Sequence, residues 1–389
     1  MHAAPGADHG TDEAQADHRR RTHPQRGKFP GPDGAPGLCF PPVPLNRCPE
    51  RGIAVASTAV IQTKQGIGDV IWHLPFIRAI AARSPGGRVT FLTLPSSQAK
   101  PLLAAEPAVD EVVYFEHNGS QAARLVHQLT LARLLRRRRF ETVWILDRTT
   151  RPAVSAFLAG IPNRYGLGLG RQSWLITNGG IDRRYFHAHP IGWLQALMEA
   201  MDIPLADTEP RLKLPPEIVT AIAARFRAAP RPWIVFGLGA SHPDKEWSEA
   251  HMAAFVAAIG ARSPGTLFAI GGPANAARAQ RLRASTGAGH VVDACGLDLI
   301  EAAALLACAD AYVGPDSGPM NIAAAVGTPA FGLYGLTPVI AYSRHLHPIR
   351  SPRTDGSAAE AMQAIDPRAV ADTVAQFLAA RAPRIAVDV

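Results

Sequence analysis

The feature that most constrains the fold is a repeated alternation between short, β-branched apolar runs and longer helical runs. In the first half of the chain the apolar runs predict four strands, at residues 53–61, 89–94, 112–115 and 142–146. A helical run follows each of them, and the clearest helices are predicted at 122–139 and 191–201. Strands that alternate with helices in this way are typical of a parallel sheet covered by helices.

The alternation occurs twice along the chain. A proline-rich joint, "PLADTEPRLKLPPEI", interrupts it at 204–218, after which five further strands are predicted, at 233–236, 267–270, 290–292, 311–313 and 330–333. We therefore predict two α/β domains with parallel sheets, 52–212 and 213–389, the last helix packing back on the first domain. In such sheets ligands bind beyond the carboxyl ends of the strands, so the loops that follow strands are the candidate sites.

The N-terminal residues have a different composition from the rest of the chain. Residues 1–51 hold nine of the 34 prolines and almost no aliphatic periodicity. We predict a disordered extension there. The remaining chain of this 389-residue, 47% hydrophobic protein is long enough to bury a large core.

The charge of the chain favours anionic partners. The net charge is +8, and arginine supplies nearly all of the positive charge because only five lysines occur. No zinc-finger, RNA-recognition or basic-zipper pattern is present, so no nucleic-acid partner is expected. The densest basic patch is residues 136–139. It is either a solvated helix end favoured by the helix dipole or a contact with an anionic, lipid-linked acceptor at a membrane face.

The cysteine and histidine patterns predict neither a metal site nor a cofactor. The four cysteines form no CxxC pair, and His187 and His189 are more simply an incidental HxH. The sequence has no uncharged apolar run of about 18 residues and no secretory signal pattern at its start. We expect reduced thiols in a cytoplasmic protein, with peripheral contact at the inner membrane face as an additional expectation.

The first candidate loop is "IQTKQGIGDVIWHLPFIRAI". Gly66 and Gly68 resemble a dinucleotide fingerprint, but the third glycine is absent, so the match fails. Asp69 is interpreted either as a helix cap or as a base that accepts a proton from a substrate hydroxyl. Because Pro75 would disrupt a continuous helix, we predict a short turn at 69–73 and a main helix from Pro75, which leaves Asp69 exposed.

The second candidate loop is "IVFGLGASHPDKEWSEAHMAAF". A strand ends in glycines, and a helix begins near Ser248, whose hydroxyl is a good helix cap. Between them lies Lys245. It is either a phosphate ligand or a solvated loop lysine, and this stretch alone does not separate the two.

The third candidate loop, "ADAYVGPDSGPMNIAAAVGTPAFGLYG", is the most specific. The strand runs into Asp316, Ser317 and Gly318, and Pro319 begins a helix of small residues. The N–H groups at the start of that helix predict an anion site, to which Ser317 can add a hydroxyl donor. Asp316 suits hydrogen bonds from sugar hydroxyls better than it suits phosphate.

Together, three segments resemble the heptosyltransferase family of glycosyltransferases, typified by ADP-heptose:lipopolysaccharide heptosyltransferases. They are "GIGDVIWHLPFIRAI", "GASHPDKEWSE" and "LIEAAALLACADAYVGPDSGPMNIAAAVGTPAFGLYG", and the resemblance runs from about residue 53 to 380. The resemblance implies the GT-B architecture, two Rossmann-like domains facing across a cleft. It also implies sugar transfer with inversion and without a metal, and this chain has no DxD motif.

The resemblance also assigns roles to individual residues. It implies Asp69 as the general base, in the acceptor-binding N-terminal domain, and it implies a nucleotide-sugar site in the C-terminal domain. The residues that it places at the donor are Ser241 and Lys245 at the phosphates, Asp316, Ser317 and Gly318 at the sugar and helix end, and Gly271 and Gly272 in the nucleotide-side loop.

Two departures from the family pattern concern the donor. Asn321 stands where the family usually has histidine, and "GGPANAAR" lacks the acid that tends to follow the Gly-Gly-Pro turn. The resemblance implies transfer of heptose from ADP-heptose to a lipopolysaccharide-type or other glycan acceptor. The alternatives are a transferase that uses another nucleotide-sugar in surface-glycan synthesis, a non-catalytic nucleotide-sugar-binding relative, and a sugar-nucleotide epimerase.

Overall fold

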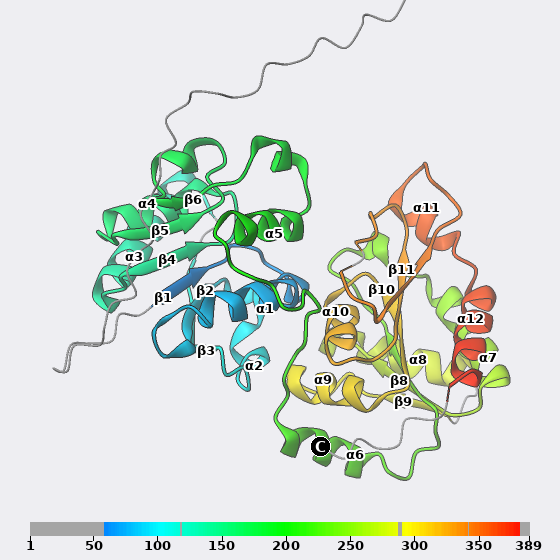
Figure 1. Ribbon diagram of the computed structural model, residues 1–389. Coiled ribbons are helices and arrows are strands. Elements are labelled where there is room, and N and C mark those ends of the chain that lie inside the picture. The colour runs from blue at the N-terminus through cyan, green and yellow to red at the C-terminus, as the bar shows by residue number, and fades with distance from the viewer. Residues whose placement is uncertain (1–57, 117–118, 287–289, 341, 382–389) are drawn as a thin grey trace, which may run out of the picture. The chain divides into compact units, whose positions relative to one another are not determined.

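The computed structural model describes residues 58–116, 119–286, 290–340 and 342–381. Within them the chain forms two six-stranded parallel sheets, one in each half, with helices packed on them (Figure 1). The predicted N-terminal extension and the first five residues of the predicted strand 53–61 lie outside the described residues. No helix in the described part is both long and apolar enough to cross a membrane.

The first half contains strands β1 to β6 and helices α1 to α5. The strands are β1 Thr58–Ile61, β2 Val89–Thr93, β3 Val109–Tyr114, β4 Thr142–Ile145, β5 Asn163–Gly166 and β6 Asn178–Gly179. The helices are α1 Ile67–Ala81, α2 Ala99–Leu102, α3 Gln121–Arg138, α4 Thr150–Leu158 and α5 Pro190–Ala200.

The second half repeats this organisation. Its strands are β7 Trp233–Gly237, β8 Thr266–Ile270, β9 Val291–Asp293, β10 Ala311–Pro315, β11 Ala330–Tyr334 and β12 Leu346–Arg350. Its helices are α6 Pro216–Arg225, α7 Glu249–Arg262, α8 Ala276–Thr286, α9 Leu299–Cys308, α10 Gly318–Ala325, α11 Ala358–Gln363 and α12 Pro367–Ala379.

Both sheets have the same strand order. The first runs β3-β2-β1-β4-β5-β6 and the second β12-β11-β10-β7-β8-β9, the Rossmann order in each case. The order reverses between β1 and β4 in the first sheet and between β7 and β10 in the second, where Val313 pairs with Phe236. Crevices for ligands open at such points, so the loops after these four strands are placed to form a site.

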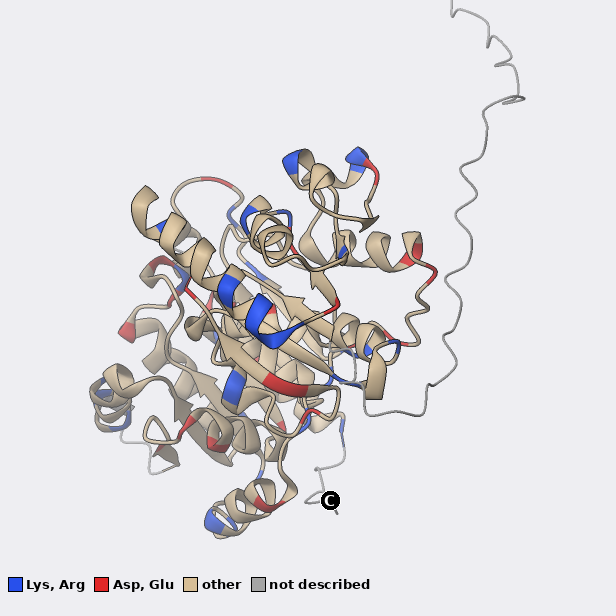
Figure 2. Cartoon of the chain, turned by 90° about the vertical axis from the view of Figure 1, so that its left-hand side faces the viewer, with Lys and Arg blue, Asp and Glu red and all other residues tan. Residues whose placement is uncertain are grey.

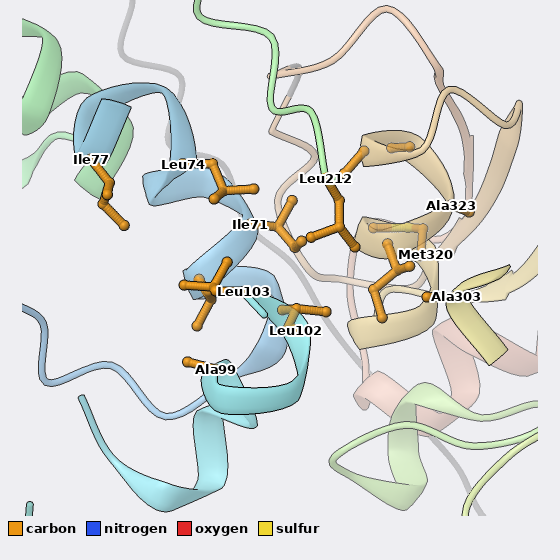
Figure 3. Close-up of a cluster of buried hydrophobic side chains, with 14 of the residues drawn as sticks. Ile71, Leu74, Ile77, Ala99, Leu102, Leu103, Leu212, Ala303, Met320 and Ala323 are labelled. Carbon is orange, nitrogen blue, oxygen red and sulfur yellow. The ribbon is translucent and has the colours of Figure 1, made fainter. Parts of the chain in front are cut away.

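The apolar core explains why the central strands are continuous hydrophobic runs. All residues of β1, β7, β8, β10 and β11 are buried, as expected for parallel strands covered by helices on both faces. One cluster of buried side chains includes Ile71 and Leu74 of α1 together with Leu212 and Met320, which lie close together in Figure 3. Helix α1 therefore packs against α10.

The structure corrects the prediction that Pro75 breaks the first helix. Helix α1 is continuous from Ile67 to Ala81 with Pro75 inside it. A proline in a helix interior costs about 3 kcal/mol. Burial of large side chains on both sides of it, Ile71 and Ile77 among them, at about 1.5–3 kcal/mol each, outweighs that cost.

Three strands were absent from the sequence prediction, and each lies toward a sheet edge. β5 and β6 hold few β-branched residues. They form through their neighbours in the sheet, β5 by pairing with β4 and β6 by pairing with β5. β12 contains Pro348, which has no N–H to donate and is tolerated because β12 is an edge strand. The last described helix, α12, packs against α7 of its own half.

Candidate active site

Lys245 and Asp316 meet at the point where the strand order of the second sheet reverses. Lys245 ends a short turn after β7, and Asp316 follows β10, the strand that pairs with β7. The Lys245 Nζ lies 3.0 Å from the Asp316 Oδ2, and the two side chains are 26% and 20% exposed. Two residues singled out separately in the sequence thus form one partly exposed ion pair.

A second ion pair, between Glu246 and Arg278, anchors the loop that carries Lys245. Glu246 Oε1 accepts a hydrogen bond from the Ala240 N–H at 2.9 Å, and its Oε2 lies 2.7 Å from the Arg278 Nη1. The same arginine nitrogen also donates to the Leu238 carbonyl at 2.8 Å. Arg278 of α8 thus contacts two parts of the loop and Glu246 binds a third, so Lys245 projects from an anchored backbone.

The start of α10 lies directly beside this ion pair. Ser317 is the N-cap and Gly318 the first helical residue, as the sequence indicated. The first N–H groups of a helix have no helical acceptor and can bind an anion. The Ser317 hydroxyl is buried and forms no hydrogen bond of good geometry with the residues described. The Ser317 hydroxyl and the Gly318 N–H therefore lie one and two residues after Asp316.

Asp69 lies in the first turn of α1 and is used as part of its cap. Its Oδ2 accepts the Gly66 N–H at 3.0 Å, and the residue is partly buried, not exposed. The prediction of an exposed Asp69 on a separate turn is therefore wrong, since the helix begins before it. Its other oxygen, Oδ1, forms no hydrogen bond with any described residue and is left for another partner.

Two histidines and a lysine surround Asp69. The His73 Nδ1–H donates to the Asp69 carbonyl oxygen, and burial lowers the pKa of His73 although Asp69 and Asp147 oppose the shift. Burial also lowers the pKa of His189, whose Nδ1 accepts the Ile191 N–H at the start of α5. Lys64 reduces both pKa values further. Both imidazoles are thus favoured in the neutral form.

Asp147 is the other carboxylate at this edge of the first sheet, and both of its oxygens are hydrogen-bonded within the protein. It follows β4 and is 2% exposed. Its Oδ2 accepts the N–H and hydroxyl of Thr63 at 2.9 and 2.7 Å, and its Oδ1 accepts the N–H and hydroxyl of Thr149. With four donors on its two oxygens, Asp147 ties the loop after β1 to the loop after β4.

Asn321 connects the helix of Asp69 to the loop of Asp316. It is 3% exposed, and its Oδ1 accepts the Trp72 Nε1–H at 2.8 Å and the Tyr342 hydroxyl. Its Nδ2 donates to the Ser317 carbonyl at 2.7 Å. A neutral histidine has a single acceptor nitrogen, so asparagine, unlike histidine, can accept both donors and donate as well. The polar atoms of Asn321 are therefore all used within the protein.

Glycines permit the close approach of α1 and α10. A Cβ on Gly68 would lie 2.7 Å from the Asn321 Nδ2, and one on Gly318 would lie 3.2 Å from the Ile67 Cβ. Both distances are shorter than ordinary van der Waals contact. Gly68 and Gly318 thus have packing roles in addition to any role in binding.

The remaining predicted donor residues lie in two neighbouring loops. Ser241 is exposed in the loop after β7, and Gly271 and Gly272 follow β8. The Asn275 side chain lies between these loops, since Cβ atoms on Gly239 and Gly271 would lie 2.9 and 2.8 Å from its Nδ2. Asn275 belongs to the stretch "GGPANAAR", which contains no acidic residue.

Several residues of this region were missed by sequence reasoning. They are Trp72, Tyr342, Glu246, Arg278 and Asn275. Trp72 was inside a quoted motif, but its indole N–H has a partner 249 residues away. No local pattern identifies such a partner. Among the described residues, no three histidines, cysteines or acids lie close enough together to hold a metal ion. His189 instead caps a helix, and Cys295 and Cys308 are buried.

A family model described as glycosyltransferase family 9 (heptosyltransferase) matches residues 128–354, more than half of the chain. The chain belongs to glycosyltransferase family 9. The family resemblance seen in the sequence is thereby confirmed, and this family 9 chain is a heptosyltransferase-like glycosyltransferase. Lys245, Asp316 and Asn321 lie inside the matched region, and Asp69 lies before it.

Two relatives are both named lipopolysaccharide heptosyltransferase 2. The Salmonella typhimurium protein is 26% identical over 289 residues, which cover 69% of this chain and 80% of the relative. The Escherichia coli protein is 26% identical over 298 residues, with the same shares.

Solved structures of the family confirm the predicted GT-B fold. E. coli ADP-heptose lipopolysaccharide heptosyltransferase II superposes with a TM-score of 0.65 at 21% identity, over 83% of this chain and 99% of that one. E. coli WaaC with ADP-2-deoxy-2-fluoro heptose gives 0.62 at 17% identity, over 82% and 99%. A family 9 protein from Veillonella parvula gives 0.67 at 18% identity, over 84% and 98%.

Proposed function

We propose that this family 9 chain transfers heptose from ADP-heptose, with inversion and without a metal, to a lipopolysaccharide-type or other glycan acceptor. The observation that carries the proposal is the Lys245–Asp316 ion pair beside the N-terminus of α10. A cation and free N–H groups suit a diphosphate, and a carboxylate suits sugar hydroxyls. The relatives named for heptose transfer, and WaaC solved with ADP, support this choice of donor.

In the proposed reaction the acceptor binds to the first half and the nucleotide-sugar to the second. The acceptor oxygen attacks the anomeric carbon while Asp69 Oδ1 takes the hydroxyl proton. The bond from that carbon to the phosphate oxygen breaks, and the diphosphate leaves with the electron pair. Lys245, the Ser241 and Ser317 hydroxyls and the start of α10 stabilise the charge on the leaving group.

A second candidate is a transferase that uses a different nucleotide-sugar. Asn275 favours it, because this uncharged side chain occupies the turn after Gly271 and Gly272, where the family tends to have an acid. A third is a relative that binds nucleotide-sugar without transferring it. We place the enzyme in the cytoplasm, with peripheral contact at the inner membrane face.

Isothermal titration of ADP, UDP, GDP and CMP tests the donor directly, with Lys245→Ala as the variant and Lys213→Ala as the matched control. Lys213 is an exposed lysine outside the candidate site. ADP binding that is lost only in Lys245→Ala supports the proposal. Binding of another nucleotide supports the second candidate, and transfer assays with the matching donor then follow. Absence of binding to all four contradicts both transferase proposals.

A further inference from the structure

Helix α3 presents an apolar and basic face to solvent. Its buried side carries Leu131, Ala132 and Leu135. On the opposite side Leu125 and Val126 are each 59% exposed and Leu129 is 39% exposed. At about 100° per residue, these three lie within one third of the helix circumference together with exposed arginines at three positions, Arg133, Arg136 and Arg137. The aliphatic residues occupy the first half of this face and the arginines the second.

Helix α4 extends the apolar part of this face. The Ser155 hydroxyl donates to the Gln128 carbonyl at 2.9 Å, which places α4 alongside α3. At the end of α4, Phe157 is 54% exposed and Leu158 is 49% exposed. The α3–α4 surface is defined here as the eight residues Leu125, Val126, Leu129, Arg133, Arg136, Arg137, Phe157 and Leu158. Five large apolar side chains are thus exposed on two adjacent helices.

All charged residues of this surface are basic. Helix α3 contains no acidic residue. Arg138 is paired with Glu111 of β3, but Arg133, Arg136 and Arg137 form no ion pair within the described part of the chain. Figure 2 views the chain from the side on which α3 lies in Figure 1 and shows basic segments in blue on that side. An occupant of this surface must therefore offer both negative charge and an apolar layer.

We propose that the α3–α4 surface lies against an anionic lipid bilayer. Large aliphatic and aromatic side chains next to arginines, on a convex helix face, suit the boundary between headgroups and acyl chains. A second copy of the chain fits less well, because α3 offers no negative charge: in a two-fold contact the arginines would face either each other or the partner's apolar side chains. An anionic polymer would neutralise the arginines but leave the apolar side chains in water.

This inference deepens the proposed function, which includes an acceptor linked to lipid, and it rests on that function for its biological meaning. Helix α3 follows β3, whose carboxyl end lies at the same edge of the first sheet as the loop of Asp69, since all strands of the sheet are parallel. The N-terminal, apolar part of α3 is therefore at the acceptor edge of the first half.

Co-sedimentation of the full chain with vesicles tests the inference. The vesicles contain phosphatidylglycerol mixed with phosphatidylcholine, or phosphatidylcholine alone. We expect binding to the anionic vesicles only, weakened by added salt. The triple variant Arg133→Gln, Arg136→Gln, Arg137→Gln should lower the binding constant about a hundredfold, since a basic residue near such a surface contributes roughly a factor of five. The variant Leu125→Gln, Val126→Gln, Leu129→Gln should also reduce binding markedly.

The matched control replaces exposed arginines of the second half, Arg227→Gln, Arg353→Gln and Arg368→Gln, and should bind vesicles like the wild type. ADP titration of every variant separates this inference from the proposed function, because nucleotide binding is expected to be unchanged by all of them. Equal vesicle binding by all variants, or none by the wild type, overturns the inference. So does a dimer that the apolar variant dissociates while vesicle binding persists, since the surface would then join two copies.

Discussion

Lys245 and Asp316 are 71 residues apart in the chain, yet the Lys245 Nζ and the Asp316 Oδ2 lie 3.0 Å from each other. They meet because β7 and β10 are neighbours and parallel, so that the loops after them leave the sheet at the same edge. In the proposed complex Lys245 binds the diphosphate, either in place of the Asp316 carboxylate or together with it. Each residue of the pair is then expected to affect donor binding in a different way.

The first prediction concerns this pair. Lys245→Ala should weaken ADP binding by about tenfold or more, because a hydrogen bond to a charged group contributes roughly 1.5–3 kcal/mol. Asp316→Asn removes the competing carboxylate and should retain ADP binding while reducing sugar transfer. Titration calorimetry and a transfer assay measure the two effects. If Asp316→Asn lost ADP binding as completely as Lys245→Ala, the separation of roles would be wrong.

The second prediction separates the two roles of Asp69. Asp69→Asn keeps an oxygen that can accept the Gly66 N–H but removes the base, so transfer should fall by about 10²–10⁴-fold with little loss of stability. Asp69→Ala also removes the cap and should lower the free energy of unfolding by a further ~0.5–2 kcal/mol. Transfer rates and thermal melts of both variants give the answer. Near-wild-type turnover in Asp69→Asn would exclude it as the base.

The third prediction concerns the buried amide of Asn321. Trp72→Phe removes the indole donor. Asn321→Ala removes the Oδ1 acceptor, so that both the Trp72 indole N–H and the Tyr342 hydroxyl lose their partner. An unpaired buried group costs about 1–3 kcal/mol, so each variant should be destabilised. A double-mutant cycle on the unfolding midpoint should give a coupling of about 1 kcal/mol.

Asn321→His supplies the control for that cycle. The imidazole can accept a hydrogen bond from only one of the two donors, so this variant too should be less stable than the wild type. Additive effects of Trp72→Phe and Asn321→Ala would show that the hydrogen bond between them contributes little.

The fourth prediction compares two glycines. Gly68→Ala would place a Cβ 2.7 Å from the Asn321 Nδ2, and overpacking of this kind costs about 1–3 kcal/mol. Gly272→Ala meets no atom within 4 Å and should leave stability unchanged. Thermal unfolding of both variants checks this. If nucleotide binding falls in Gly272→Ala while its stability holds, the loop after β8 contacts the donor directly.

The fifth prediction follows from the lowered pKa of His73. The folded protein holds His73 neutral, whereas the unfolded chain takes up a proton below the ordinary value of 6.5. The stability linked to His73 is therefore present above that value and is lost as the pH falls below it. The free energy of unfolding should therefore fall progressively as the pH is lowered through 6.5. Urea unfolding of the wild type should show this dependence more strongly than His73→Leu; parallel curves would contradict it.

Much of the fold could be predicted from the sequence, because the central strands are continuous apolar runs between helical runs. β5 and β12 could not, since neither "NRYG" nor "LHPIR" has a strand pattern without its neighbour in the sheet. Pro75 led to a wrong helix boundary, because the rule for proline is local and the burial that overrides it is not.

The candidate site, too, could be predicted from the sequence only in part. The types and spacing of residues in three loops pointed to Lys245, Asp316 and Asp69. Their neighbours were not predictable, since the contact of Asn321 with Trp72 depends on the packing of α1 on α10 and not on either segment alone. The Tyr342 hydroxyl reaches the same amide from a loop without regular structure.

The hydrogen bond from the Gly66 N–H to Asp69 has a consequence for the proposed catalytic cycle. It holds the carboxylate in one rotamer before any substrate arrives, so little ordering of the base remains to be done on binding. In the proposed reaction, the proton that Asp69 takes up weakens this hydrogen bond at the first turn of α1. Each transfer would thus loosen the start of this helix until the proton leaves, and release of that proton would restore both the base and the helix end.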